Sequence, residues 1–391
     1  MEESESSGSD SWHSIDRTLA DIESSFDFLT LISCEDLDTA WEEFRSAAFE
    51  RAPALRPPSL DVDVDGLRRR VASLPIHRIE DVDLQFLLAS KQAGLDWQLH
   101  MLQQRGTRTF LTQSMLHYHP VSDGLLKVAR ESIEDLPDSN GGDDEMVDAD
   151  GIRERAEREL EIYRKQDPDF SPEIRQEEDQ ASLQASDGDL LVPDDMELPP
   201  TRLEALTQHE VGAHVVTYHN GMSQPLQILR NGLSDYDEMQ EAIGVLAEFF
   251  ADGFTPMRLR TLAARVIGVH SLEEGASFVE TFRTLTNDVG LGEYNAFAVT
   301  ARIHVCSGFT RDQIYLRGLI DLLGYLRADG ELEPLYIGKI GFQHIPSLTR
   351  LRQRGFLSEP PLRPAFLQNE NARSKLKALR KGLSPRDLVT G

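Results

Sequence analysis

Residues 201–221 read TRLEALTQHEVGAHVVTYHNG, and this pattern predicts one helix that carries two histidines and a glutamate near its middle. Thr201 is expected to cap the helix, with Glu204 three residues later as its capping-box partner. Asn220 and Gly221 form a typical helix end. We expect the rest of the chain to be organised around this helix.

The centre of this helix has an H-E-x-x-x-H pattern made by His209, Glu210 and His214. In the familiar metallopeptidase pattern, H-E-x-x-H, the histidines are four residues apart and share one helix face. Five residues of a regular helix place two imidazoles about 140° apart, too far for one tetrahedral ion. A local π-type turn would reduce this angle to about 50°, and Gly212 lies where the helix would most easily widen. The alternative is a helix with two unrelated histidines and a surface glutamate.

A candidate third ligand lies in residues 232–252, GLSDYDEMQEAIGVLAEFFAD. Asp235 is expected to cap a helix there, with Glu238 at its third position. Glu241 lies about a quarter-turn from the apolar stripe of this helix, which suits the third ligand of a His-His-Glu catalytic zinc site. The alternative is a solvated carboxylate. Three further carboxylates compete with Glu241 by proximity: Asp237, Glu238 and Glu248.

These motifs resemble those of a zinc metallopeptidase family named for its QEGLA motif, which includes the microtubule-associated tyrosine carboxypeptidases. The chain is similar to a bacterial-type member. The QEGLA motif corresponds to residues 240–244, QEAIG, in which the glutamate is retained. The resemblance extends to HEVGAH, NGMSQPL, YDEMQEAIGVLAE, QRGTRTFLTQSMLHYHP, TARIHVCSGFTRDQIYLRGL and, more loosely, IDRTLADIESSFDFL.

The resemblance implies that His209, His214 and Glu241 bind one zinc ion per chain and that Glu210 is catalytic. It also implies a zinc-dependent carboxypeptidase that removes a C-terminal Tyr or Phe from a peptide or protein with metal-activated water. The alternatives are a zinc dipeptidyl peptidase or endopeptidase, or a non-catalytic zinc-binding regulatory protein. The glutamate next to the first histidine favours an enzyme, because a structural zinc site needs no base.

Substrate-binding residues are expected in the stretch 300–319. Arg302 and Arg311 can bind a terminal carboxylate, and Tyr315 can donate a hydrogen bond beside the metal. The alternative for each residue is a salt bridge or a core tyrosine.

The composition indicates a protein with a sizeable core and strong solubility. The 391 residues are 40% hydrophobic, and the formal net charge of −27 argues against nucleic-acid binding. The charge is uneven, because residues 131–197 are strongly acidic and residues 339–386 are basic. Two cysteines and the lack of a long apolar run predict no disulfide framework, no signal peptide and no membrane span. We therefore expect a cytoplasmic protein.

The predicted fold is α+β and predominantly helical, with an N-terminal helical lobe over a zincin-like catalytic lobe. Strands are predicted at residues 189–193 and 335–339, and residues 295–304 fit either a strand or a buried helix. The predicted parts are a disordered tail (1–14), the helical lobe (15–136), an acidic flexible loop (137–151) and the catalytic lobe with a basic C-terminal helix (152–385). The sequence does not define the oligomeric state.

Overall fold

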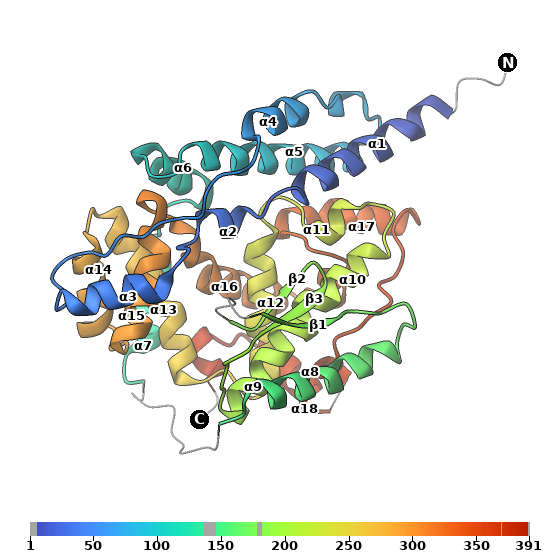
Figure 1. The fold of residues 1–391 in the computed structure, drawn as a ribbon. Helices are drawn as coiled ribbons and strands as arrows, with labels where there is room; N and C mark the ends of the chain where they lie inside the picture. Colours follow the sequence, from blue (N-terminus) through green and yellow to red (C-terminus); the bar gives the residue numbers. More distant parts are fainter. Residues whose placement is uncertain (1–5, 137–145, 178–181, 369, 390–391) are drawn as a thin grey trace.

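The computed structural model describes residues 6–136, 146–177, 182–368 and 370–389. The protein is predominantly helical with one small sheet, so the predicted α+β class is confirmed (Figure 1). Most of the predicted acidic loop, residues 137–145, lies outside the described residues. None of the described helices is long and apolar enough to cross a membrane.

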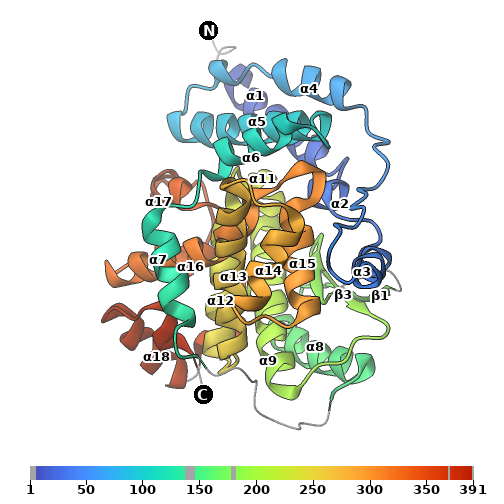
Figure 2. The ribbon, with the colours of Figure 1, turned by 90° about the vertical axis from the view of Figure 1, so that its left-hand side faces the viewer.

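Part of the N-terminal segment forms a helical layer above the rest of the molecule (Figure 1). Its helices are α1 (Ser6–Glu23), α2 (Phe28–Ile32), α3 (Leu37–Ser46), α4 (Val64–Ala72), α5 (Val82–Gln103), α6 (Arg108–Tyr118) and α7 (Asp123–Ile133). Helix α1 begins at Ser6, within the segment predicted as a disordered tail. Not all of these helices belong to the upper layer, because α3 packs against α15 (Glu293–His304) and α7 packs against α13 (Pro256–Glu273), as Figure 2 shows.

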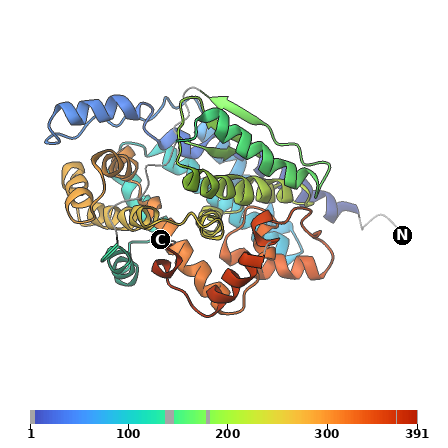
Figure 3. The ribbon, with the colours of Figure 1, turned by 90° about the horizontal axis from the view of Figure 1, so that it is seen from below.

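A three-stranded sheet lies beside the centre of the molecule. It consists of β1 (Ile174–Glu177), β2 (Gln184–Ser186) and β3 (Asp189–Pro193), in the order β1-β3-β2. Strand β3 pairs in parallel with β1 and antiparallel with β2, which confirms the strand predicted at residues 189–193. Helix α8 (Ala149–Arg164) covers this region and packs against α9 (Pro200–Thr207), as the view from below shows (Figure 3).

The motif helix and the helix after it form the centre of the fold. The motif helix consists of α9, a π-helix at Gln208–Val215 and α10 (Val216–Met222). The π-helix packs against α12 (Tyr236–Phe250), which in turn packs against α16 (Ile314–Arg327). Because α12 is apolar on most of its circumference, it is buried between its neighbours. The other helices are α11 (Ile228–Asn231), α14 (Phe278–Asn287), α17 (Ile345–Gln353) and α18 (Glu370–Arg380).

Short 3₁₀ turns connect many of these elements. They are Ile76–Arg78, Val305–Ser307, Thr310–Gln313, Glu333–Tyr336, Phe342–His344, Ala365–Gln368 and Pro385–Leu388. The strand predicted at residues 335–339 is therefore wrong, because that segment begins in a 3₁₀ turn and pairs with no strand of the described chain. Residues 295–304 belong to helix α15, so the helical alternative holds there.

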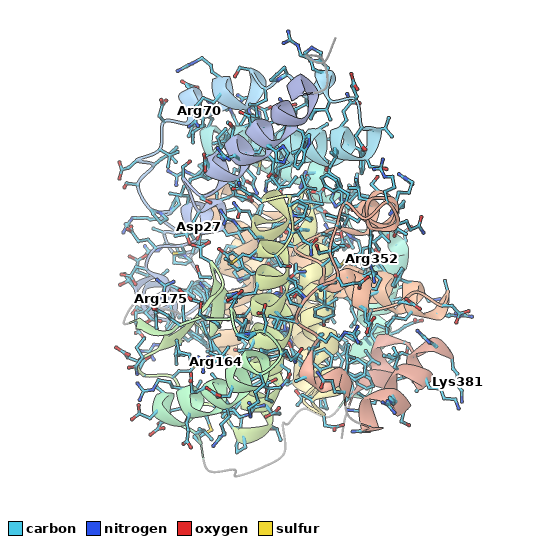
Figure 4. All side chains as sticks on the ribbon, turned by 90° about the vertical axis from the view of Figure 1, so that its right-hand side faces the viewer. Asp27, Arg70, Arg164, Arg175, Arg352 and Lys381 are labelled. Carbon is cyan, nitrogen blue, oxygen red and sulfur yellow. The ribbon has the colours of Figure 1, made fainter. Side chains whose placement is uncertain are left out.

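The buried apolar side chains form one continuous cluster that extends from Ile15 to Leu388. This core joins the two predicted lobes, and the division between them stays a prediction. Part of the basic C-terminal segment pairs with acidic residues of the same chain. For example, Arg352 pairs with Glu359 at 2.5 Å, whereas Lys381 points outward after α18 (Figure 4).

Candidate active site

The two histidines of the motif lie side by side because the helix widens between them. Residues Gln208–Val215 adopt the predicted π-helix, and the ring centroids of His209 and His214 are 4.9 Å apart. A Cβ atom on Gly212 would lie 2.9 Å from the Gln208 side chain and 3.4 Å from the Phe366 ring. Glycine therefore lets two side chains approach the widened turn. The prediction of a π-type turn is confirmed.

The predicted N-terminal cap of the motif helix is wrong, and the helix ends one residue beyond the predicted Gly221. Helix α9 begins at Pro200, whose fixed φ suits the first helical position, and no side chain caps its N-terminus. Thr201 is therefore inside the helix, and Glu204 binds Arg155 at 2.7 Å instead of closing a capping box. At the other end, α10 continues to Met222.

His209 is held by two carboxylates. Its Nδ1 atom lies 2.8 Å from Glu248 Oε1, and its Nε2 atom lies 3.6 Å from Glu241 Oε2. Burial alone would lower the pKa of His209, but the Glu241 and Glu248 carboxylates raise it to about 9. The Glu248 contact fixes the ring so that Nε2 faces Glu241.

His214 has a neutral partner in place of a carboxylate. Its Nδ1 atom lies 3.3 Å from Gln240 Oε1, which also accepts a hydrogen bond from Thr217 at 2.8 Å. Because an amide oxygen only accepts, His214 Nδ1 carries the proton, and Nε2 keeps a free lone pair. Burial and then the neighbouring charge of His209 lower the pKa of His214 to about 4. Both imidazoles thus have their Nδ1 atoms occupied.

Glu248 has a larger role in the site than its place in the sequence suggests. It is fully buried and accepts hydrogen bonds from Arg202 at 2.6 Å and from Arg258 at 2.8 Å, in addition to its contact with His209. Burial raises the pKa of Glu248, but these arginines outweigh it and keep the carboxylate ionised. One feature of the sequence points to Glu248: it lies seven residues, nearly two turns, after Glu241, so both side chains are near the same face of the helix.

Glu241 reaches the histidines from α12. Its Oε1 atom accepts hydrogen bonds from Tyr315 at 3.0 Å and from Arg311 at 3.3 Å, which leaves Oε2 directed toward His209. Burial raises the pKa of Glu241, but the hydrogen bond with His209 and the charge of Arg311 outweigh burial and lower this pKa well below its usual value. Glu241 is therefore ionised. The candidate metal-ligand atoms that all lie within 4.8 Å of one another belong to His209, Glu210 and His214. Glu241 is not part of this group, although its Oε2 atom lies 3.6 Å from His209 Nε2.

The helix that carries Glu241 begins differently from the prediction. Asp235 stands at the N-cap position in a left-handed conformation (φ 57°) and makes no side-chain cap. It pairs with His117 at 2.8 Å instead. Glu238, the expected capping-box partner, binds Arg317 at 2.6 Å. These pairs attach the start of α12 to α6 and α16.

Glu210 is buried beside the histidines. Its Oε2 atom accepts a hydrogen bond of 2.9 Å from the Ala185 amide of β2, and its Oε1 atom lies 4.0 Å from His209 Nε2. Burial raises the pKa of Glu210 to about 7, although the charge of His209 lowers it in part. A carboxyl group with this pKa can accept and release a proton near neutral pH.

Two of the three predicted substrate residues, Arg311 and Tyr315, contact this cluster, and each of the three has a partner. Arg311 is buried and bridges Asp237 at 2.7 Å and Glu241. Arg302 makes two hydrogen bonds of 2.8 and 2.9 Å to Asp312. Tyr315 donates a hydrogen bond to Glu241. The guanidinium carbon of Arg265 lies 4.1 Å from the centroid of the Tyr315 ring. Arg311 and Tyr315 therefore hold Glu241, and the substrate role of all three stays a prediction.

The cluster can be compared with known proteins. The sequence model described as microtubule-associated tyrosine carboxypeptidase matches residues 42–384, which include all the residues of this site. No curated protein matches the chain. Because the match covers most of the 391 residues, the chain belongs to the microtubule-associated tyrosine carboxypeptidase family.

Proposed function

We propose that this protein is a zinc-dependent carboxypeptidase that removes a C-terminal Tyr or Phe from a peptide or protein. Family membership supports a carboxypeptidase in general. The zinc requirement and the aromatic preference are the finer parts of the proposal. The observation that carries it is the pair of imidazoles whose Nδ1 atoms are held by Glu248 and Gln240, beside Glu210 and Glu241.

The residues of the cluster fit a catalytic zinc site. Two imidazoles and one carboxylate are the donor set of many zinc peptidases, which keep a fourth position open. In such sites a carboxylate or carbonyl usually holds the second nitrogen of each ligating histidine. Glu248 and Gln240 have this relation to His209 and His214. We therefore assign one zinc ion per chain to His209, His214 and Glu241.

The protein supplies proton transfer and charge to the reaction. Lewis-acid activation of water and of the scissile carbonyl would come from the bound zinc. Glu210 takes a proton from the attacking water and passes it to the leaving amine, a role that suits its pKa of about 7. The hydrogen bond from Ala185 fixes one oxygen of this carboxylate and leaves the other on the histidine side.

A peptide library with varied C-termini tests this function. The zinc-loaded protein is incubated with the library, and the products are identified by mass spectrometry. We expect peptides that end in Tyr or Phe to lose one residue and their C-terminally amidated forms to resist cleavage. Loss of two N-terminal residues would indicate a dipeptidyl peptidase, and cuts within the chain would indicate an endopeptidase. No cleavage of any peptide would favour a regulatory zinc protein.

A further inference from the structure

A carboxypeptidase needs a cation for the terminal carboxylate of its substrate. This carboxylate lies one residue beyond the scissile carbonyl, and consecutive residues are about 3.8 Å apart, so the cation must be close to the reacting groups. A cation that is already paired with a protein carboxylate must give up that partner to bind the substrate. An unpaired cation near Glu210 is therefore the better candidate.

The arginines around the cluster are already committed. Arg311 binds Asp237 and Glu241, and Arg302 binds Asp312 through both hydrogen bonds of its fork. Two further arginines, Arg202 and Arg258, bind Glu248. Arg265 lies 3.8 Å from Asp312 and over the Tyr315 ring. Each of these five side chains has a carboxylate partner within 4.0 Å, although Nε and Nη1 of Arg265 make no hydrogen bond in the described chain.

Lys339 is different, because its ammonium group makes no hydrogen bond or ion pair to the described part of the chain. Its nearest partners are aromatic, since Nζ lies 5.4 Å from the ring centroid of Tyr218 and 5.7 Å from that of Tyr236. Aromatic faces attract an ammonium ion without neutralising its charge. The charge of Lys339 is therefore available to a ligand.

The two tyrosines connect Lys339 to the active site. Tyr218 lies four residues, about one turn, after His214, and Tyr236 begins the helix that carries Glu241. The rings beside Lys339 thus belong to the two segments that carry His214 and Glu241. Burial lowers the pKa of Lys339, whereas the carboxylates of Glu23, Asp187 and Glu210 raise it in part. The ammonium group therefore lies beside the segments that form the proposed site.

The backbone of Lys339 is held firmly. Its amide donates to the Leu229 carbonyl at 2.8 Å, and its carbonyl accepts from the Leu233 amide at 3.0 Å. The preceding Gly338 has no room for a side chain, because a Cβ atom there would lie 2.6 Å from the Leu229 carbonyl oxygen. A fixed backbone limits the positions of the ammonium group and reduces the entropy lost on binding.

We propose that Lys339 binds the C-terminal carboxylate of the substrate, with the rings of Tyr218 and Tyr236 beside its ammonium group. This inference rests on the proposed function, because it names the residue that selects a free chain end for the same site. It assigns to Lys339 the role that the sequence alone suggested for Arg302 or Arg311.

The test uses zinc-loaded Glu210→Gln protein, in which binding is measured without turnover. A peptide that ends in Tyr is titrated by calorimetry as the free acid and as the amide. We expect Lys339→Met in this background to weaken binding of the free acid by about 10- to 100-fold, the effect of losing a hydrogen bond to a charged group. Binding of the amide should change less than threefold, and Lys339→Arg should restore most of the preference for the free acid.

The matched control is Lys127→Met, which makes the same exchange at an exposed lysine of α7. It should keep the preference for the free acid. If Lys339→Met keeps that preference, or loses free acid and amide equally, Lys339 does not bind the carboxylate. The proposed function is tested separately, by measuring cleavage of Tyr-ending peptides by the protein in which Glu210 and Lys339 are both unchanged. If that protein trims Tyr-ending peptides, a failed Lys339 result overturns only this inference, and if it trims none, both fall.

Discussion

Charges are arranged differently around α12 and along α8. In α8 the charged side chains are mostly solvent-exposed and pair within one or two turns of the same helix, as Arg158 does with Glu154 at 3.0 Å. Around α12 the charges are buried and come from distant parts of the chain, as in the contacts of Glu248 with Arg202 and His209. Exposed pairs contribute little, whereas a buried charge that loses its partner is costly. The conspicuous charge of the sequence therefore lies mainly outside the site, and the few buried charges determine the chemistry.

The largest effect is expected at Glu210. Glu210→Gln keeps the size of the side chain but cannot accept a proton, so activity on a Tyr-ending peptide should fall by about two to four orders of magnitude. Zinc content and the thermal unfolding midpoint should change little. Peptide hydrolysis followed by mass spectrometry, with metal analysis of the same sample, measures both. Hydrolysis at nearly the normal rate would place the base elsewhere.

The second effect concerns Glu241, which we assign as the carboxylate ligand. Glu241→Ala removes one of three protein ligands and also leaves Arg311 without one of its two carboxylates. The purified variant should lose most of its zinc. Glu161→Ala, at an exposed carboxylate of α8, is the control and should keep about one zinc per chain. Full zinc content in Glu241→Ala would remove Glu241 from the ligand set.

Glu248 should have a smaller effect on the metal, because it acts through His209. Glu248→Gln replaces the buried carboxylate by a neutral amide of the same shape, so the His209 ring is less strongly oriented. We expect zinc affinity to fall by about 10- to 100-fold, the usual effect of losing such a partner. Competition with a chelator of known affinity measures this change. Glu161→Gln makes the same exchange at an exposed residue and is the control. If both variants bind zinc with equal affinity, Glu248 has a purely structural role.

These residues also show what the sequence could predict. The five-residue spacing of His209 and His214 makes sense for one ion only with a widened turn, so the π-helix followed from local geometry. The capping of α9 was misjudged, because Pro200 begins a helix without any side-chain cap. The strand predicted at residues 335–339 is wrong because the segment begins in a 3₁₀ turn and no strand of the described chain lies beside it to pair with it.

The surroundings of the ligands were beyond sequence reasoning. Glu248 and Glu241 are both glutamates on α12, and only the packing of Arg202, Arg258 and Tyr315 shows which one orients His209 and which one faces the cluster. The seven-residue spacing places Glu241 and Glu248 near one face of α12, but their contacts join residues that are far apart in the chain, so spacing alone does not assign their roles. The same limit applies to Lys339, whose aromatic neighbours come from two other segments.

Buried groups should also make stability depend on pH. Burial lowers the pKa of His304 to about 4, and its Nε2 atom lies 2.9 Å from Thr281 Oγ1. Because the unfolded chain binds a proton near pH 6.5 and the folded chain does not, this residue makes stability fall as the pH drops from about 6.5 toward 4.

The His304 contribution to the change between pH 7 and pH 5 should be about 1 to 2 kcal/mol. His304→Gln should therefore lose less stability over this range than the unaltered protein does in urea denaturation at the two pH values. His77→Gln, at an exposed histidine, is the control and should follow the unaltered protein. An unchanged pH dependence in His304→Gln would show that His304 does not contribute.

The smallest effect is expected in α8. A double-mutant cycle with Arg158→Ala and Glu154→Ala isolates the energy of one exposed pair, whose side chains are 62% and 72% accessible. Water screens this pair and both side chains lose rotamer freedom when they meet, so the coupling should be about 0.3 to 0.5 kcal/mol and should decrease in high salt. Urea denaturation of the four proteins at low and high salt measures it. A coupling above about 1 kcal/mol that persists in salt would contradict the contrast between the two regions, because the surface charges of α8 would then stabilise the fold as buried ones do.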